Sequence, residues 1–210
     1  MDKKGLIESM KRSGALKSKN IIAAFEKVKR EEFCLEEYRS SAYEDRPLPI
    51  IAGQTISQPT TVAMMTEALK PKLGDKILEI GAGSGYQAAI ISEIVGKKGI
   101  VFTIERIKEL VEFARKNLKH HGNVVVLEGD GSGGLKEEAP FDGIIVTAGA
   151  PQIPEPLKKQ LKIGGRIVIP VGGTFSQDIS VIERVGKDKF ETTNIGPFVF
   201  VPLIGKHAWK

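Results

Sequence analysis

A short glycine-rich segment near the middle of the chain constrains the fold more than any other feature. Residues 76–80 are mainly apolar, glycines follow at positions 81, 83 and 85, and residues 86–91 then have a helical pattern. The order strand, glycine loop, helix is typical of the first unit of a nucleotide-binding α/β sheet. Glycine lets the backbone turn sharply and approach a ligand that a Cβ atom would push away. We therefore predict that a nucleotide binds at this loop.

Strands and helices alternate after this first unit. We predict helices over 85–95, 107–118 and 155–161, and further strands over 100–104, 124–128, 142–147 and 166–171. This alternation indicates an α/β fold with a doubly wound, mostly parallel sheet, because strands such as 144–146 are apolar throughout. The β-rich C-terminal tail has no helical period. It predicts strands over 179–185 and 197–203, which would add antiparallel partners at one edge of the sheet.

Residues 1 to about 70 are predicted to form a mostly helical N-terminal region. Asn20 is placed to cap its second helix, and Pro59 to begin its third. Prolines and a glycine within 46–59 exclude a long helix and favour an ordered loop or a short extended segment. We expect the 210 residues to form a single domain, with a helical region over 1–70 that covers the substrate, a cofactor-binding core over 71–172 and C-terminal strands over 173–210.

The residues around the glycine loop limit which nucleotide can bind. A dinucleotide site requires G-x-G-x-x-G, and the position of its third glycine is occupied by Tyr86. Glu79 stands just before the loop, Glu105 ends the second strand, and Asp130 follows the third strand. The carboxyl ends of these strands form the edge at which open α/β sheets bind ligands. The carboxylate of Glu79 would oppose a pyrophosphate there.

These three acids fit a cationic nucleoside. Glu105 can accept hydrogen bonds from two ribose hydroxyls, Asp130 can accept one from the amine of an adenine, and Glu79 can attract an ammonium group. S-adenosylmethionine, which carries a sulfonium and an ammonium, satisfies all three. The alternative is that they are surface or capping acids, but their shared position at strand ends favours the cofactor.

Four segments resemble those of the class I S-adenosylmethionine-dependent methyltransferases: residues 78–85, Glu105, residues 129–131 and residues 141–146. The resemblance implies a Rossmann-like fold in which S-adenosyl-L-methionine is the cofactor and S-adenosyl-L-homocysteine its product. The cofactor-binding residues that it implies are Glu79, Gly81, Ala82, Gly83, Ser84, Gly85, Glu105, Gly129, Asp130, Gly131 and Thr147.

Residues 42–50 and 53–59, with later matches in 146–148, 164–172 and 200–205, resemble the protein-L-isoaspartate O-methyltransferases. This resemblance extends over about 28–205, with departures within 28–35, where two prolines of the family are absent. It implies transfer of a methyl group to the free α-carboxylate of an L-isoaspartyl residue in a damaged protein or peptide. The ester then closes to a succinimide, which hydrolyses partly to aspartate.

A carboxylate acceptor requires little acid–base chemistry. It is already ionised at neutral pH, so the reaction needs desolvation and in-line placement rather than a general base. We expect Ser57 to be the catalytic residue that orients the carboxylate by a hydrogen bond, unless it merely caps the helix beginning at Pro59. The other substrate-binding residues that we expect are Thr55, Ile56, Val201, Pro202 and Leu203. The last three would hold the peptide by strand addition or would form an ordinary edge strand.

Several other functions use the same fold. The net charge of +5 fits an RNA substrate, and an RNA or small-molecule methyltransferase is the main alternative. The lysines and glutamates of this chain are interspersed, however. Residues 146–149 also lack the Asn/Asp-Pro-Pro-aromatic run with which other methyltransferases hold an exocyclic amine. A non-catalytic cofactor-binding module is disfavoured by the intact glycine loop and Ser57, and a nicotinamide oxidoreductase by Tyr86 and Asp130.

The remaining features of the sequence predict no metal and no membrane span. The chain has one cysteine, Cys34, so no internal disulfide can form. Metal-ligand spacing and long apolar windows are both absent. We expect a cytoplasmic monomer that acts on isoaspartyl-containing peptides and proteins and has no nucleic-acid or membrane partner.

Overall fold

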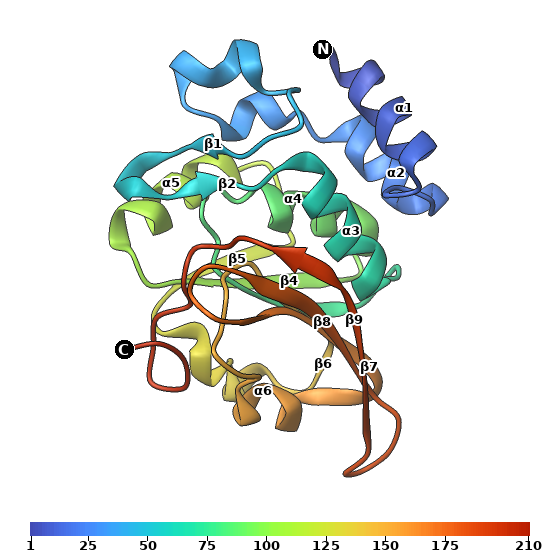
Figure 1. The fold of residues 1–210 in the computed structure, drawn as a ribbon, viewed down its shortest axis with the longest axis vertical. Helices are drawn as coiled ribbons and strands as arrows, with labels where there is room; N and C mark the ends of the chain where they lie inside the picture. The colour runs from blue at the N-terminus through green and yellow to red at the C-terminus, as the bar shows by residue number, and fades with distance from the viewer.

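The computed structural model describes all 210 residues. A sheet of seven strands, in the order β5-β4-β3-β6-β7-β8-β9, forms its centre (Figure 1). Strands β3 to β7 pair in parallel, and β8 and β9 continue the sheet antiparallel. This confirms the predicted mostly parallel α/β sheet. Its strands are β3 Lys76–Ile80, β4 Ile100–Glu105, β5 Val124–Glu128, β6 Phe141–Val146, β7 Leu161–Gly172, β8 Gln177–Arg184 and β9 Phe190–Phe198.

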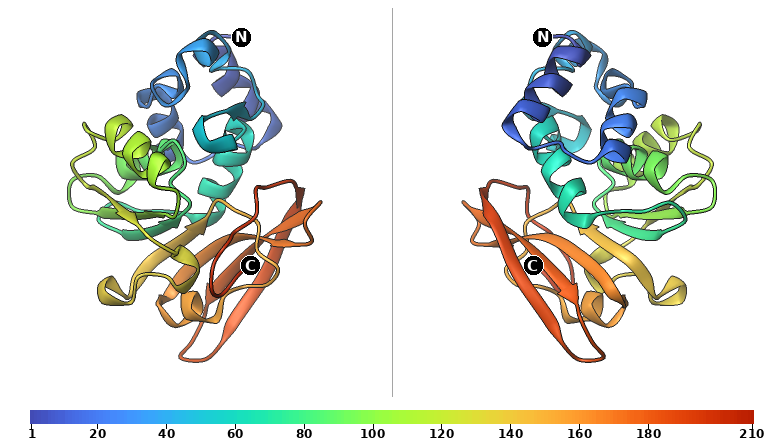
Figure 2. Two further views of the ribbon diagram at one scale, coloured as in Figure 1. Left: turned by 90° about the vertical axis from the view of Figure 1, so that its left-hand side faces the viewer. Right: turned by 90° about the vertical axis from the view of Figure 1, so that its right-hand side faces the viewer.

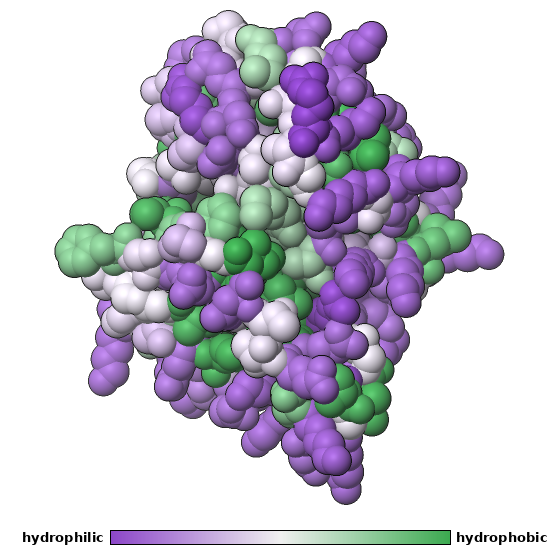
Figure 3. Space-filling model, turned by 45° about the vertical axis from the view of Figure 1, so that its right-hand side comes forward, coloured by the Kyte–Doolittle hydropathy of each residue, from purple (hydrophilic) through white to green (hydrophobic).

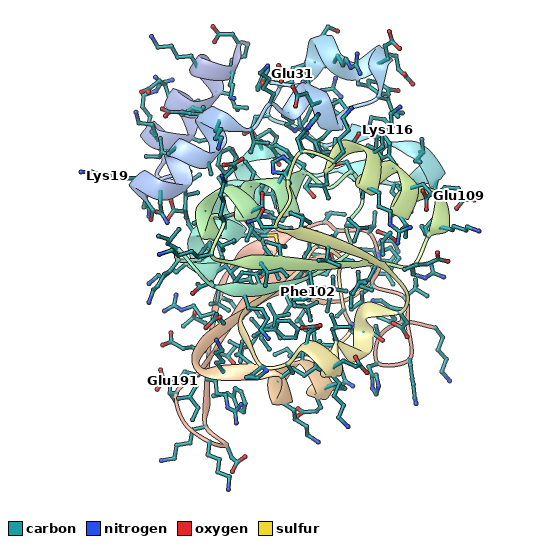
Figure 4. All side chains as sticks on the ribbon, turned by 180° about the vertical axis from the view of Figure 1, so that it is seen from behind. Lys19, Glu31, Phe102, Glu109, Lys116 and Glu191 are labelled. Carbon is teal, nitrogen blue, oxygen red and sulfur yellow. The ribbon has the colours of Figure 1, made fainter.

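Helices cover both faces of the sheet. Helices α3 (Pro59–Leu69), α4 (Tyr86–Val95) and α5 (Lys108–Asn117) lie on one face, and the short α6 (Glu155–Lys159) lies on the other (Figures 1 and 2). Each face has its own apolar cluster, of 36 buried residues on the α3–α5 side and 15 on the α6 side. In the smaller cluster the rings of Phe102 and Phe141 meet edge to face at 6.3 Å, and Figure 4 shows Phe102 in the interior.

The N-terminal region adds to the larger cluster. Helices α1 and α2 pack beside α3 and α4 and share that cluster through residues such as Leu6 and Phe25. A two-stranded antiparallel hairpin of β1 and β2 lies just before α3, so the predicted short extended segment is present. The elements of this region are α1 Lys3–Ser13, α2 Lys19–Lys27, the 3₁₀ helices η1 Arg30–Phe33, η2 Glu36–Ser41 and η3 Ile51–Gly53, and the strands β1 Leu48–Pro49 and β2 Thr55–Ile56.

Two local predictions were wrong. Helix α2 is preceded by Ser18, so Asn20 lies inside its first turn and its side chain instead donates to the carbonyl of Pro71 at 3.3 Å. The last strand covers Phe190–Phe198 rather than 197–203. Its first half is polar and exposed because it lies at the edge of the sheet, so alternation of apolar residues does not reveal it.

The topology places the carboxyl ends of β3, β4, β5 and β6 along one edge of the sheet. The chain order reverses between β3 and β6, and a crevice forms at such a reversal because the flanking connections go to opposite faces. The connection from β5 to β6 contains two 3₁₀ helices, η4 (Gly131–Gly133) and η5 (Lys136–Glu138). None of the helices combines the length and the apolar character needed to span a membrane.

Candidate active site

A cleft opens at the strand reversal, between the carboxyl ends of β3, β4 and β6. Three segments from distant parts of the chain close it: residues 54–57 before α3, residues 80–84 of the glycine loop, and residues 201–204 near the C-terminus. Of the 26 lining residues, 13 are hydrophobic, so a bound reactant would lose much of its water. The predicted site residues that line the cleft are Thr55, Ile56, Ser57, Gly81, Ala82, Gly83, Ser84, Glu105, Gly129, Gly131, Thr147, Val201, Pro202 and Leu203.

The glycine loop packs tightly against the end of β6. Gly81, Gly83 and Gly85 have φ values of 95°, 53° and 88°, in the left-handed region that favours glycine. A Cβ atom on Gly81 would overlap the hydroxyl oxygen of Thr147. That hydroxyl donates to the carbonyl of Gly81 at 2.7 Å. Thr147 therefore ties β6 to the loop, and no side chain larger than hydrogen fits at position 81.

Glu105 lines the cleft with both carboxylate oxygens fixed. Oε2 accepts a hydrogen bond from the Gly83 amide at 3.1 Å, and Oε1 accepts one from the Ile107 amide at 3.0 Å. A carboxylate oxygen can accept more than one hydrogen bond, so each oxygen keeps acceptor capacity. The side chain is thus preorganised to accept from a pair of hydroxyl groups in the cleft.

Glu79 lies on β3 just before the loop but does not line the cleft. It is fully buried, and neither of its carboxylate oxygens has a hydrogen-bond partner. Burial, together with the smaller effect of the nearby charge of Glu105, raises the pKa of Glu79 to about 8. A buried carboxyl group without a hydrogen-bond partner lowers the stability of the protein. Its position next to a cleft therefore suggests that a bound ligand interacts with it.

Asp130 also does not line the cleft. Its carboxylate accepts hydrogen bonds from the amides of Ser132 at 2.9 Å and Lys206 at 2.7 Å. Burial raises the pKa of Asp130, but the hydrogen bonds from Lys206 and Ser132, with the nearby charge of His207, outweigh it and leave the pKa below its ordinary value. The acid therefore fastens the C-terminal segment beside the cleft. Gly205 permits this contact, since a Cβ atom there would overlap the Asp130 carboxylate.

Ser57 lines the cleft. Its carbonyl accepts from Arg30, and its hydroxyl makes no hydrogen bond within the protein. Helix α3 is preceded by Gln58 and has no side-chain cap, so the alternative that Ser57 caps this helix finds no support. The hydroxyl is free to donate to a ligand. Of its neighbours on β2, Ile56 is buried and Thr55 is exposed.

Arg30 supports the segment that contains Ser57, a role that was not predicted from the sequence. This arginine is fully buried. Its guanidinium donates to the carbonyls of Ala42 at 2.5 Å, Arg46 at 3.2 Å and Ser57 at 3.0 Å. It also lies 5.9 Å from the ring centre of Tyr86, the first residue of α4. No carboxylate pairs with it, and since arginine is usually exposed, no sequence pattern signalled this role.

Residues 201–203 do not continue β9. The amide of Gly149 donates to the carbonyl of Val201, and the amide of Leu203 donates to the carbonyl of Gly149, both at 2.8 Å. Pro202, between them, has no N–H, and its carbonyl accepts no backbone hydrogen bond. This exposed carbonyl remains available at the mouth of the cleft. Several apolar lining residues were not predicted from the sequence: Val62 and Met65 of α3, Leu110 of α5, and Ile107, which directly precedes α5.

The sheet order, the glycine loop at the strand reversal and the fixed Glu105 together define an S-adenosylmethionine-dependent methyltransferase of class I. A family model described as Protein-L-isoaspartate(D-aspartate) O-methyltransferase (PCMT) matches residues 1–208. The chain belongs to this family, and the predicted resemblance, enzyme class and cofactor are confirmed.

Relatives and solved structures match the chain over nearly its whole length. The protein-L-isoaspartate O-methyltransferases of Staphylothermus marinus and Methanothermobacter thermautotrophicus are each 49% identical to it, covering 100% of this chain and 96% and 98% of their own. A solved protein-L-isoaspartate O-methyltransferase has a TM-score of 0.89 at 32% identity, over 99% of this chain and 67% of that one. A putative protein-L-isoaspartate O-methyltransferase from Plasmodium falciparum, in complex with S-adenosyl-L-homocysteine, has a TM-score of 0.84 at 26% identity, over 97% and 99%.

Proposed function

We propose that this enzyme methylates the free α-carboxylate of L-isoaspartyl residues in damaged proteins and peptides, the activity named in its relatives. The observation that carries the proposal is the unpaired hydroxyl of Ser57 in a cleft that the cofactor loop also lines. A donor in this position suits an acceptor that is already an anion. No histidine, cysteine or lysine lines the cleft to act as a general base.

The residues around the cleft fit S-adenosylmethionine, which when bound supplies a methyl group made electrophilic by its sulfonium. The glycine loop leaves room for close approach of the backbone, and the Glu105 oxygens can accept from the two ribose hydroxyls. Ser84 and Thr147 lie alongside. The unpaired carboxyl of Glu79 is the group that a cationic ammonium would stabilise. Gly129 and Gly131 line the side of the cleft that we assign to the adenine, and Asp130 between them holds the C-terminal segment beside it.

The protein contributes orientation and the exclusion of water. Ser57 would donate a hydrogen bond to one carboxylate oxygen of the substrate and so orient the other oxygen towards the cofactor loop. The apolar side chains of Ile56, Val62 and Leu203 reduce competition from water for that anion. The methyl ester leaves the enzyme. The neighbouring peptide nitrogen then attacks the ester carbonyl without further catalysis, the bond to the methoxy group breaks, and methanol leaves as the succinimide forms.

The substrate backbone has a natural partner in the 201–203 segment. The free carbonyl of Pro202 can accept a hydrogen bond from a peptide N–H, while Val201 and Leu203 line the cleft. Recognition through backbone groups tolerates many sequences, as repair of damage at varied positions requires. We further propose that the protein acts as a cytoplasmic monomer on such peptides and proteins, without nucleic-acid or membrane partners.

The test uses methyl-labelled S-adenosylmethionine and two peptides that differ only in an aspartyl or an isoaspartyl linkage. We expect base-labile label on the isoaspartyl peptide alone, because a carboxyl methyl ester hydrolyses in base. Binding of S-adenosylhomocysteine is measured in parallel to establish that the cofactor site is intact. Label on neither peptide, with the cofactor site intact, would overturn the proposed acceptor, and label on RNA instead would identify the alternative enzyme.

A further inference from the structure

Two large apolar side chains are exposed beside the mouth of the cleft. Phe175 lies in the turn between β7 and β8 and is 90% exposed, and Val199 follows β9 and is 78% exposed. Gln177 of β8 pairs with Phe198 of β9, and the Gln177 side chain accepts from the amide of Phe200 at 2.8 Å. These contacts place the turn next to the segment that contains Val199. Apolar residues also gather across the middle of the face seen in Figure 3.

The core does not explain this exposure. Phe198 and Phe200 alternate with Val199, and both pack against the larger apolar cluster, with their rings 6.3 Å apart. Val199 therefore points away from the core between two anchored neighbours. Phe175 likewise belongs to a turn, where a polar residue would be expected. Exposed apolar side chains grouped near a cleft mark a binding surface more often than scattered ones do.

The chain runs directly from these residues into the cleft. Phe200 is followed by Val201 and Pro202, which line the cleft mouth and carry the free carbonyl. An isoaspartyl residue bound in the cleft remains joined to its polypeptide on both sides. Its flanking residues must therefore cross the rim. Val199 directly precedes the residues that lead into the cleft, and the turn with Phe175 is held beside them by Gln177.

We propose that Phe175 and Val199 form an apolar rim that binds apolar side chains flanking the isoaspartyl residue of a polypeptide substrate. This inference rests on the proposed function and refines its substrate class. Segments rich in apolar residues are buried in folded proteins and exposed when a damaged protein unfolds. The rim thus directs the enzyme towards isoaspartyl residues in unfolded segments, while the backbone contacts accept any sequence.

The experiment compares two isoaspartyl peptides of equal length and charge, one with valine and leucine beside the isoaspartyl residue and one with serine and threonine. Wild-type enzyme is expected to have a KM about five- to tenfold lower for the apolar peptide, which is the effect of partly burying one or two side chains. In the double variant Phe175→Ser, Val199→Thr the KM for the apolar peptide rises and the preference disappears. Its affinity for S-adenosylhomocysteine reports that the fold and cofactor site persist.

Ile163→Ser is the matched control. Ile163 is 64% exposed at the start of β7, at the end of the sheet opposite the cleft, and its substitution is expected to leave the peptide preference unchanged. Equal KM values of the wild type for the two peptides, or a preference that survives in the double variant, would contradict the proposed apolar rim. So would light scattering that shows a wild-type dimer converted to a monomer by the double variant, because the surface would then bind a second copy. Methylation of neither isoaspartyl peptide would instead contradict the proposed function.

Discussion

At the scale of single residues, Ser57 has the most specific expected effect. Ser57→Ala removes a hydroxyl from a residue that lines the cleft, and it breaks no hydrogen bond within the protein because the Ser57 carbonyl still accepts from Arg30. A hydrogen bond to a charged group contributes roughly 1.5–3 kcal/mol. We therefore expect kcat/KM for an isoaspartyl peptide to fall about 10- to 100-fold, with S-adenosylhomocysteine affinity unchanged. Full activity of the variant in a labelled-methyl assay would contradict the catalytic assignment.

Arg30 is expected to affect both stability and activity. Arg30→Met would leave the carbonyls of Ala42, Arg46 and Ser57 without their donor. At about 1 kcal/mol or more for each buried carbonyl, the free energy of unfolding should fall by roughly 3 kcal/mol. Arg30→Lys keeps the charge, but a lysine cannot donate to three carbonyls as the forked guanidinium does. Its free energy of unfolding should therefore lie between those of the wild type and Arg30→Met. Denaturant unfolding measures these free energies. If Arg30→Met were as stable as the wild type, Arg30 would not stabilise the segments that contain these three carbonyls.

Glu79 makes the stability of the cofactor-free protein depend on pH. The pKa of Glu79 is raised to about 8 in the folded protein, chiefly by burial, whereas the unfolded chain ionises near the ordinary value. Between about pH 5 and 8 the folded state holds the extra proton, so this residue lowers stability as pH rises. Glu79→Gln should therefore stabilise the cofactor-free protein by an amount that grows to about 2–4 kcal/mol at pH 8. Thermal melts at pH 5 and pH 8 test this, and an equal gain at both values would contradict it.

At the scale of elements, the junction between the glycine loop and β6 offers a test of close packing. Gly81→Ala would place a methyl group against the Thr147 hydroxyl and force alanine into a φ of 95°. Both effects should destabilise the loop, by about 2–3 kcal/mol in total, and weaken S-adenosylhomocysteine binding. Adding Thr147→Ala removes the overlap but not the backbone strain, so we expect partial recovery. If the double variant bound no better than Gly81→Ala, crowding by Thr147 would not be the cause.

Most elements were predictable because their burial leaves a period in the sequence. Strands β3 and β5 were predicted with the observed ends, and α4 and α5 within one residue. Strand β9 was misplaced because residues such as Glu191 and Asn194 are exposed at the sheet edge and carry no apolar alternation. Periodicity therefore locates the centre of an α/β sheet better than its edges.

At the scale of the whole molecule, the cleft was predictable in part. Glu105 and Gly129, which the sequence places after strand ends, line the same cleft, because strand ends in a parallel sheet gather along one edge. The role of Arg30 and the fastening of Asp130 to the C-terminal segment were not predictable. Both depend on contacts between segments distant in the chain, such as the hydrogen bond from Lys206 to Asp130. Local patterns contain no information on such pairings.

The shared apolar cluster predicts how the whole chain unfolds. Helix α2 meets α4 through Phe25 and Tyr86, whose rings are perpendicular at 6.4 Å, and this contact belongs to the same 36-residue cluster as Ile145 and Val168 of the sheet. The N-terminal region and the core should therefore unfold in one transition, with calorimetric and van't Hoff enthalpies equal. S-adenosylhomocysteine should raise the Tm of that single transition. Removal of residues 1–27 should expose the α4 side of the cluster and abolish cooperative unfolding, whereas two separate transitions in the intact chain would show that the region forms a domain of its own.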